Sequence, residues 1–127
     1  MKLKILIGGL GFIAILFFCA CKKTAGPGGK NAISGTVVFK NGVTGNNDVA
    51  VLATVSIAYG TNESTTSFNQ TVLTDAEGKY IFEGLNKGNY FIKADFTDSH
   101  GFKYSTNGSV ISIKNKKNKV TADLILE

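Results

Sequence analysis

The chain has 127 residues, of which 43% are hydrophobic and 18% are charged, and its net charge at neutral pH is +5. All fourteen basic residues are lysines, and the chain contains two cysteines, one histidine, one proline and no tryptophan. This length suits one ordinary domain with a tail, and the composition excludes a disordered tail, a collagen-like repeat and a miniprotein held together by disulfides.

The first twenty residues have the features of a secretory signal. Lys2 and Lys4 precede an apolar run over residues 5–20, which contains three glycines. A helix that spans a membrane needs about 20 apolar residues, so this run is short for that role. We therefore expect a cleaved signal peptide over residues 1–20, with an uncleaved anchor as the alternative.

The segment that ends at Cys21 resembles the lipobox of bacterial lipoproteins, whose cysteine becomes the first mature residue and carries a diacylglycerol and a further acyl chain. Cys21 follows the small Ala20, whereas Cys19 follows Phe18, which is too large for the position before the cut. Phe18 also stands where the lipobox usually has leucine. The resemblance assigns lipidation to Cys21, and Cys19 would leave with the signal peptide.

Several acyl chains would tether the mature chain to a membrane without spanning it. Loss of residues 1–20 would leave twelve lysines against nine acidic residues, a net charge of +3. Residues 21–31 are expected to form the lipidated cysteine and a flexible spacer, because residues 22–31 contain three glycines, the only proline and no large apolar side chain. The folded domain is expected over residues 32–127.

From Ala32 onward, hydrophobic and polar residues alternate in short runs, and no stretch of ten residues has the 3.6-residue period of a helix. The runs that predict strands cover residues 33–39, 49–59, 67–74, 80–85, 90–96, 102–113 and 120–126. Seven short strands with turn signals every 8–15 residues are typical of an antiparallel sandwich. We therefore predict an all-β, seven-stranded β-sandwich.

Two of the turns have residues suited to their geometry. Asn41-Gly42 suits a turn with positive backbone angles. In the turn over residues 75–78, Asp75 can accept hydrogen bonds from the amides ahead of it, and Gly78 can take the left-handed final angle.

The central segment Thr74–Phe82 (TDAEGKYIF), followed by Gly84-Leu85 and Gly88-Asn89-Tyr90, resembles the carboxypeptidase regulatory-like domains and their T-D-x-x-G-x-Y-x-F and G-L-x-x-G-x-Y pattern. Residues 33–37 and 122–126 are similar to the edges of that family, so the resemblance covers about residues 32–126. It implies a transthyretin-like Greek-key sandwich that serves as a spacer, an adhesion module or an appendage of transporters and enzymes, and that is rarely catalytic alone. Residues 43–48 depart from the family, which often has a proline before the second strand.

Candidate metal ligands are few. Asp95, Asp98 and His100 are close in sequence and could bind a metal weakly, but zinc and iron sites need more convergent ligands, and a solvated hairpin tip explains these residues better. Asp75 and Glu77 could be calcium ligands, but calcium takes about six oxygens, and their turn explains them more simply. We predict no metal and no cofactor.

No catalytic residue is assigned either. Ser99 beside His100 is proximity in sequence and not the geometry of a triad. The transthyretin-like hydrolases of purine breakdown resemble this fold but use several histidines and arginines, and ring-cleaving dioxygenases of similar topology use two histidines and two tyrosines at iron. With one histidine and no arginine, this chain matches neither, and we predict that it is not an enzyme.

Residues 114–119 (KNKKNK) form the strongest basic feature and could meet anionic lipid, lipopolysaccharide or DNA. Because no arginine or stacking aromatic accompanies them, nucleic acid is not an expected partner, and a solvated turn that discourages edge pairing is the preferred interpretation. Phe91, on an outward-facing position, is either a contact residue or packs against a neighbouring strand.

These features predict a non-enzymatic, membrane-anchored envelope lipoprotein whose sandwich is a structural or protein-interaction module. The alternative is an accessory module that binds a glycan or peptide for an outer-membrane uptake system, which exposed aromatic side chains gathered on one face or loop end would favour. The ligand-binding residues are not assigned. The Cys-Lys-Lys start and the lack of arginine resemble lipoproteins of the Bacteroidota, in which acids just after the cysteine direct surface export. Since no acid precedes Asp48, we expect an outer-membrane location that faces the periplasm.

Overall fold

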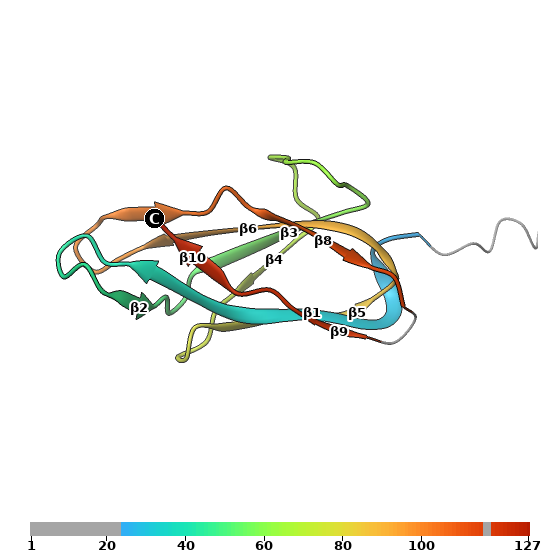
Figure 1. Ribbon diagram of the computed structural model, residues 1–127, viewed down its shortest axis with the longest axis horizontal. Helices are drawn as coiled ribbons and strands as arrows, with labels where there is room; N and C mark the ends of the chain where they lie inside the picture. The colour runs from blue at the N-terminus through green and yellow to red at the C-terminus, as the bar shows by residue number, and fades with distance from the viewer. Residues whose placement is uncertain (1–23, 116–117) are drawn as a thin grey trace, which may run out of the picture.

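The computed structural model describes residues 24–115 and 118–127 of the chain. These residues form ten β-strands in two five-stranded sheets, which pack face to face (Figure 1). The predicted all-β sandwich is therefore confirmed, but it has ten strands and not the seven predicted, because the strands expected over residues 49–59, 102–113 and 120–126 are each divided in two. The signal sequence predicted over residues 1–20, and Cys21 itself, lie outside the described residues. Nowhere in the described ranges does a helix occur that is long and apolar enough to cross a membrane.

Each sheet is built around one long strand. The strands of the first sheet are β1 (Pro27–Lys40), β2 (Asn47–Val49), β5 (Lys79–Leu85), β9 (Lys119–Thr121) and β10 (Leu124–Leu126). The strands of the second sheet are β3 (Thr54–Tyr59), β4 (Gln70–Leu73), β6 (Gly88–Thr97), β7 (Lys103–Ser105) and β8 (Ser109–Ile113). β1 and β6 run along the whole sandwich, so each can pair with two short strands in succession along one edge (Figure 1).

On one edge of β1, β5 and then β2 pair antiparallel. The amide of Val37 donates to Gly78 and the carbonyl of the same residue accepts from Ala50, which places both strands on the same side. On the other edge, β9 and β10 pair parallel with β1, so the sandwich that was predicted to be antiparallel contains two parallel pairings. Between them, the side chain of Asp123 accepts the amide of Thr36 at 2.9 Å and takes the place of a backbone partner. The predicted strand over residues 120–126 is therefore interrupted rather than continuous.

The predicted strand over residues 49–59 is wrong in its first half. β2 pairs with β1 in the first sheet, whereas β3 pairs with β4 and β6 in the second, so the chain changes sheets between them. At the crossover Leu52 has a positive φ of 59°, and Val49 and Val51 are 43% and 41% exposed instead of buried. The hydroxyl of Thr74 fixes this crossover, since it accepts the amide of Ala53 and donates to the carbonyl of residue 50.

Two further predicted strands and one predicted turn differ from the structure. The strand expected over residues 102–113 is divided into β7 and β8, and Gly108 between them has a φ of 91°. The strand expected over residues 67–74 is shortened to β4. In the turn after β1, Gly45 and not Gly42 has the positive φ, because Asn41 Oδ1 accepts the amides of residues 43 and 44 and holds an Asx turn there.

The predicted flexible spacer over residues 22–31 is also shorter than expected, because β1 begins at Pro27 and pairs with the end of β5 across a β-bulge. Asn31 is 1% exposed, and its Oδ1 accepts the amide of Asn118 at 2.7 Å. A Cβ at Gly29 would lie 2.1 Å from the carbonyl oxygen of Leu85. Glycine at this position therefore allows two backbones to approach closely, and the residue is part of the fold.

The hydrophobic core lies between the sheets, and the alternation in the sequence predicts much of it correctly. Most apolar residues at the alternating positions of β1, β5 and β6 are buried, whereas Phe96 of β6 is only partly buried. The core consists of Ile33, Val37, Phe39, Ala50, Ala53, Val55, Ile57, Tyr80, Phe82, Leu85, Tyr90, Ile92, Ala94, Tyr104, Ile111, Ile113, Leu124 and Leu126. Such a core, closed by strand pairing along both sheets, gives the rigid scaffold on which the sites below are held.

Candidate functional site

The described chain enters the sandwich through a hydrogen-bonded cluster that joins its first residues to the turn before β6. We call Gly26, Asn86 and Tyr90 the N-terminal clamp. The Tyr90 hydroxyl accepts the amide of Gly26 at 2.9 Å and donates to the carbonyl of Asn86 at 2.6 Å. The amide of Asn86 donates to the carbonyl of Gly26 at 2.8 Å, and its side-chain amide donates to Pro27 at 3.0 Å. Backbone and side-chain hydrogen bonds therefore join Gly26 and Pro27 to Asn86 and Tyr90.

Packing supports the N-terminal clamp. The ring of Tyr90 is fully buried and meets the ring of Tyr59 edge-on at a centroid distance of 5.9 Å. Ala25 packs against the core beside these rings. Burial raises the pKa of Tyr90, so the hydroxyl keeps the proton that it donates. Tyr90 precedes the outward-facing Phe91 in the predicted strand over residues 90–96, but the sequence gave no signal for its hydrogen bond to Gly26, which lies 64 positions earlier.

A second cluster closes the opposite end of the sandwich. Asp98 Oδ1 accepts the amides of His100 and Phe102, each at 2.9 Å, and its Oδ2 accepts the hydroxyl of Tyr104 at 3.2 Å. The same hydroxyl accepts the amide of Gly42 at 3.0 Å and so joins the turn after β1 to the second sheet. Desolvation of the Asp98 carboxylate raises its pKa, but the hydrogen bonds that it accepts together hold the pKa below its ordinary value.

This arrangement explains the residues that were weighed as metal ligands. Asp98 binds backbone amides of its own turn, Asp95 lies opposite Ser105 in the sheet, and His100 is exposed with its ring 6.4 Å from that of Phe102. Ser99 lies in the same exposed turn. Within residues 24–115 and 118–127, no group of three or more histidines, cysteines or acids is placed to hold a metal ion.

The turn between β4 and β5 has the geometry that the sequence predicted. Asp75 Oδ1 accepts the amides of Glu77 and Lys79, each at 2.9 Å, and Gly78 has a φ of 75°. The hydrogen bonds donated by the backbone amides of Lys79 and, to a lesser extent, Glu77 lower the pKa of Asp75. Glu77 also forms an exposed ion pair with Lys79 at 3.1 Å. The turn role of Asp75 is therefore confirmed.

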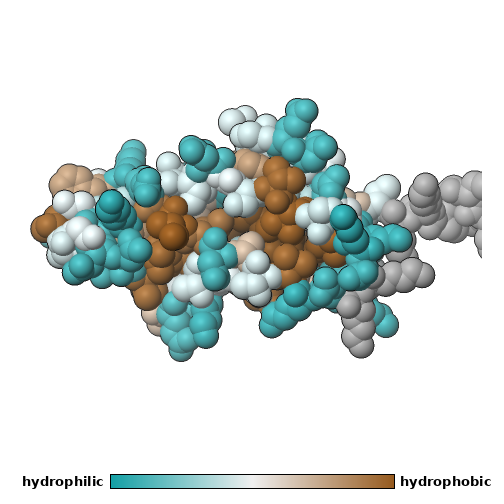
Figure 2. Space-filling model, in the orientation of Figure 1, coloured by the Kyte–Doolittle hydropathy of each residue, from teal (hydrophilic) through white to brown (hydrophobic). Residues whose placement is uncertain are grey.

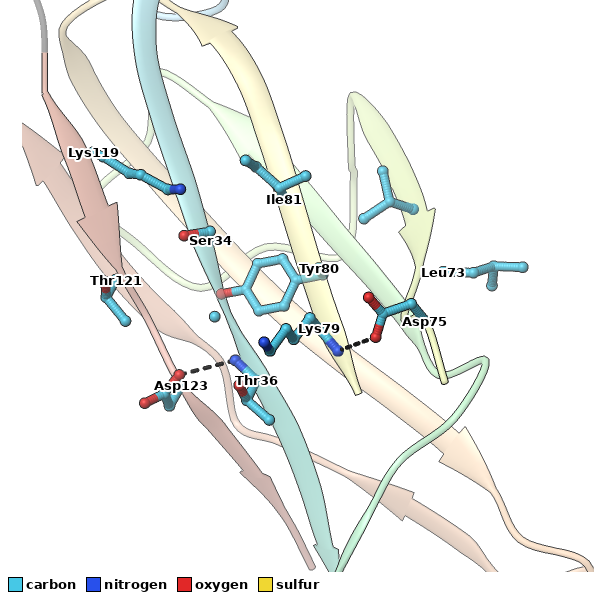
Figure 3. A pocket seen from close by; sticks show the side chains of 12 residues that line it. Ser34, Thr36, Leu73, Asp75, Lys79, Tyr80, Ile81, Lys119, Thr121 and Asp123 are labelled. Carbon is cyan, nitrogen blue, oxygen red and sulfur yellow. Dashed lines mark hydrogen bonds between the residues drawn. The ribbon is translucent and has the colours of Figure 1, made fainter. Parts of the chain in front are cut away.

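A shallow groove of about 570 Å³ lies on the outer face of the first sheet (Figure 3). Ser34 of β1 lies directly between Ile81 of β5 and Thr121 of β9, and Thr36 lies opposite Lys79. These side chains share the outer face because Ile33 and Val37, at the alternate positions, are buried. The groove is lined by Ser34, Gly35, Thr36, Val72, Leu73, Asp75, Lys79, Tyr80, Ile81, Lys119, Thr121 and Asp123.

The outer-face groove offers hydroxyl, ammonium and carboxylate groups beside two exposed aliphatic side chains. Ile81 is 40% exposed and Leu73 is 58% exposed. Among the lining residues the aromatic one is Tyr80, whose ring is buried and whose hydroxyl donates to the carbonyl of Ala122. Burial and the nearby Asp123 carboxylate raise the pKa of Tyr80. The outer-face groove can therefore hydrogen-bond a polar ligand, but none of the described residues that line it presents an open aromatic ring on which a sugar could stack.

The remaining candidate contact residues are dispersed. Phe91, whose role was left open, is 3% exposed, and the ring of Phe68 stacks on it at 6.3 Å from the loop after β3. Phe102 is the exposed aromatic side chain at the far end. In Figure 2 the apolar side chains on the visible face gather mainly in two places, with polar side chains around and between them. Lys114 and Lys119 are exposed, whereas residues 116–117 of the basic run lie outside the described residues.

Comparison with known proteins agrees with this architecture. Residues 31–127 match the family described as BOS complex subunit NOMO1-like, second beta sandwich domain. The chain belongs to this family. The match confirms the β-sandwich that the resemblance to carboxypeptidase regulatory-like domains implied. Membership in the carboxypeptidase regulatory-like family stays a prediction. No curated protein matches this NOMO1-like chain.

A solved structure has the same fold as this NOMO1-like chain. It is the crystal structure of a proposed carbohydrate-binding protein from Pseudomonas aeruginosa, with a TM-score of 0.51 and 14% sequence identity. The alignment covers 82% of this chain and 92% of that chain. At this identity the likeness shows the fold alone, and it matches the two-sheet arrangement derived above.

Proposed function

We propose that the mature protein is a non-enzymatic, lipid-anchored β-sandwich of the bacterial cell envelope, used as a structural or protein-interaction module. The observation that carries this proposal is the N-terminal clamp, which fixes the chain at one end of a rigid sandwich only a few residues after Cys21. A lipid on Cys21 would therefore hold the whole domain in a defined place at a membrane. Membership in a family of β-sandwich domains supports a module without catalysis.

The proposal includes removal of residues 1–20 and an outer-membrane location that faces the periplasm. Its support is the sequence: Ala20 precedes Cys21, and no acidic residue lies between Cys21 and Asp48. In this proposal the folded domain contacts other envelope proteins while the lipid holds it at the membrane surface.

Mass spectrometry of the protein purified from bacterial membranes tests the anchor. The expected N-terminal peptide begins at Cys21 and carries a diacylglycerol and a further acyl chain. The chain offers a matched control, because Cys19→Ser removes a cysteine that would leave with the signal peptide, whereas Cys21→Ser removes the lipidated one. Lipid retained in Cys21→Ser, or a mature mass that includes residues 1–20, would contradict the proposal.

The interaction role has its own experiment. Cross-linking in intact cells, followed by affinity capture and mass spectrometry, should recover one recurrent envelope protein with the wild-type chain and lose it with Cys21→Ser. Cross-links that map to the domain surface would identify the face used. Recovery of the same proteins at the same level from both chains would contradict a role that depends on the membrane location.

A second candidate function is binding of a glycan or peptide in the outer-face groove. The polar side chains of the outer-face groove favour it, as does the carbohydrate-binding role proposed for the similar Pseudomonas aeruginosa protein. Thr121→Lys would fill the outer-face groove with a long side chain, and Ser112→Lys, on the exposed face of β8, is the matched control. On glycan and peptide arrays, only Thr121→Lys should lose a bound ligand; equal losses, or no bound ligand, would exclude this candidate.

A further inference from the structure

Four exposed lysines gather at the end of the sandwich where the described chain enters. Strand pairing fixes their positions. Lys30 follows the N-terminal clamp in β1, and Lys87 lies in the turn between the clamp residue Asn86 and β6. Lys114 follows Ile113, which pairs with Gly88, and Lys119 pairs with Ala32. We call Lys30, Lys87, Lys114 and Lys119 the lysine end.

The acidic residues lie elsewhere. All nine acids of the chain are described, and only Glu63, in the loop that follows β3, and Glu83 of β5 lie in segments near the lysine end. The lysine end therefore carries four positive and two negative charges, a net of +2. The rest of the described domain carries Lys40, Lys79, Lys93 and Lys103 against seven acids, a net of −3.

The distance from Cys21 to the lysine end is short. Three peptide links join Cys21 to Thr24, the first described residue, and they span at most about 11 Å. This length is close to the Debye length of about 10 Å at 0.1 M salt, within which charges on the protein and on a membrane interact. β1 alone has 14 residues and spans about 45 Å, so the acids at the far end lie several Debye lengths away.

We infer that the lysine end docks on the phosphodiester headgroups of anionic phospholipid, so that the domain stands on the membrane by this end and presents its far end to partners. The inference rests on the proposed lipid anchor at Cys21. Attraction of the positive end and repulsion of the negative remainder favour the same orientation. Docking also leaves the far-end turns, with Asp98 and the exposed Phe102, pointing away from the membrane.

Fluorescence quenching from vesicles tests the orientation. The lipidated full chain is reconstituted into vesicles of phosphatidylethanolamine and phosphatidylglycerol, with spin-labelled headgroups as quenchers, and into vesicles in which phosphatidylcholine replaces phosphatidylglycerol. Ser112→Cys places a label near the lysine end, and Thr44→Cys places one in the turn between β1 and β2. The lipid occupies the thiol of Cys21, and Cys19 is removed, so the label is specific. The short tether alone keeps Ser112→Cys nearer the membrane than Thr44→Cys, so docking should appear as a larger difference in quenching in the anionic vesicles. About 1 M salt should reduce this difference to its value in the vesicles without phosphatidylglycerol.

Charge variants test whether the lysine end causes the orientation of the domain on the membrane. The triple variant K30Q/K87Q/K114Q should lose the extra difference in quenching that anionic lipid produces, because each lysine near an anionic surface favours docking by about fivefold, or about 100-fold for three. The matched variant K40Q/K79Q/K103Q removes the same charge elsewhere and should keep it. Circular dichroism melting checks that both variants fold.

The outcomes separate this inference from the anchor on which it rests. A lipidated chain whose difference in quenching is the same in anionic and neutral vesicles, or an equal loss in the two triple variants, overturns the docking and leaves the anchor in place. A mature mass without lipid refutes the anchor and the docking together. Quenching of Thr44→Cys above that of Ser112→Cys would show that the domain stands on its other end.

Discussion

The amide of Gly26 donates a hydrogen bond to the hydroxyl of Tyr90 at 2.9 Å, although the two residues are 64 positions apart in the chain. Tyr90 is fully buried in the core, so the bond ties the first described residues of the chain to the centre of the second sheet. The same hydroxyl donates to Asn86 at 2.6 Å. The first described residues are thus bound to the core. A lipid on Cys21 would therefore hold the domain in a fixed position.

Removal of this hydroxyl should destabilise the domain. Tyr90→Phe leaves the buried ring in place but deprives the amide of Gly26 and the carbonyl of Asn86 of a partner. The free energy of unfolding should fall by about 1–3 kcal/mol, the usual cost of leaving a buried polar group unsatisfied. Urea denaturation measures the change, and amide hydrogen exchange should show faster exchange at Gly26.

Tyr59→Phe is the matched control for this prediction. The hydroxyl of Tyr59 donates to Gln70 in an exposed bond at 3.1 Å, so its removal should change the free energy of unfolding by less than about 0.5 kcal/mol. Equal effects of the two substitutions, or unchanged exchange at Gly26 in Tyr90→Phe, would show that the N-terminal clamp does not hold the chain.

The sequence predicts the faces of the strands well and their sheets poorly. Alternation shows the buried face of β1 and β5 and most of that of β6, where Phe91 is buried although the pattern turned it outward. The turn at Asp75 is local enough to be recognised from four residues. Alternation does not show where a chain passes from one sheet to the other, because both sheets require the same period. The crossover at Leu52 depends on Thr74, which is 22 positions later, and was therefore missed.

The candidate sites were less predictable than the fold because they depend on long-range contacts. The outer-face groove is lined by residues of β1, β4, β5 and β9, and no single segment reveals it. The glycines of residues 26–29 indicated a flexible spacer, since glycine serves both flexible and closely packed backbone. Only the structure shows the close approach of Gly29 to Leu85. Lipidation at Cys21 was inferred from sequence alone and stays a prediction.

Alanine at Gly29 tests whether the supposed spacer is packed. Its Cβ would lie 2.1 Å from the Leu85 carbonyl oxygen, a backbone atom that cannot move alone, so Gly29→Ala should lower the free energy of unfolding by about 3 kcal/mol. The control is Gly45→Ala in the exposed turn after β1, where nothing lies within 4 Å. Its positive φ of 76° should cost about 1 kcal/mol. A smaller loss at Gly29 than at Gly45, by thermal or urea unfolding, would favour a mobile spacer.

The loop after β3 should stabilise the second sheet through one aromatic pair. Phe68 stacks on Phe91 at 6.3 Å with an angle of 17° between the rings, and it covers a residue that the strand pattern turned outward. Phe68→Ala should lower the free energy of unfolding by about 1–2 kcal/mol, because it removes apolar burial and the stacking. Phe102→Ala removes a ring that is 53% exposed and should cost less than about 0.5 kcal/mol. Equal losses would mean that the loop does not pack on Phe91 in solution.

Stability at low pH should depend on Asp75. The backbone amides of Lys79 and Glu77 hold the pKa of Asp75 below 3.8, its ordinary value, which the unfolded chain retains. The unfolded state therefore takes up the proton first on acidification. The stabilisation is complete above about pH 4 and is lost as the pH falls through the lower pKa of the folded state.

Asp75→Asn separates this charge from the shape of the turn. Asparagine keeps the oxygen that accepts both amides, so the variant should fold, but it cannot titrate. Wild type should be more stable than Asp75→Asn at about pH 7, and the difference should shrink as urea unfolding is repeated toward about pH 2. Asp95→Asn removes an exposed carboxylate for which no hydrogen bond is found among the described residues, and it is the control for lost charge. A difference for Asp75→Asn that stays constant with pH would mean that the amides bind the charged and neutral side chains equally.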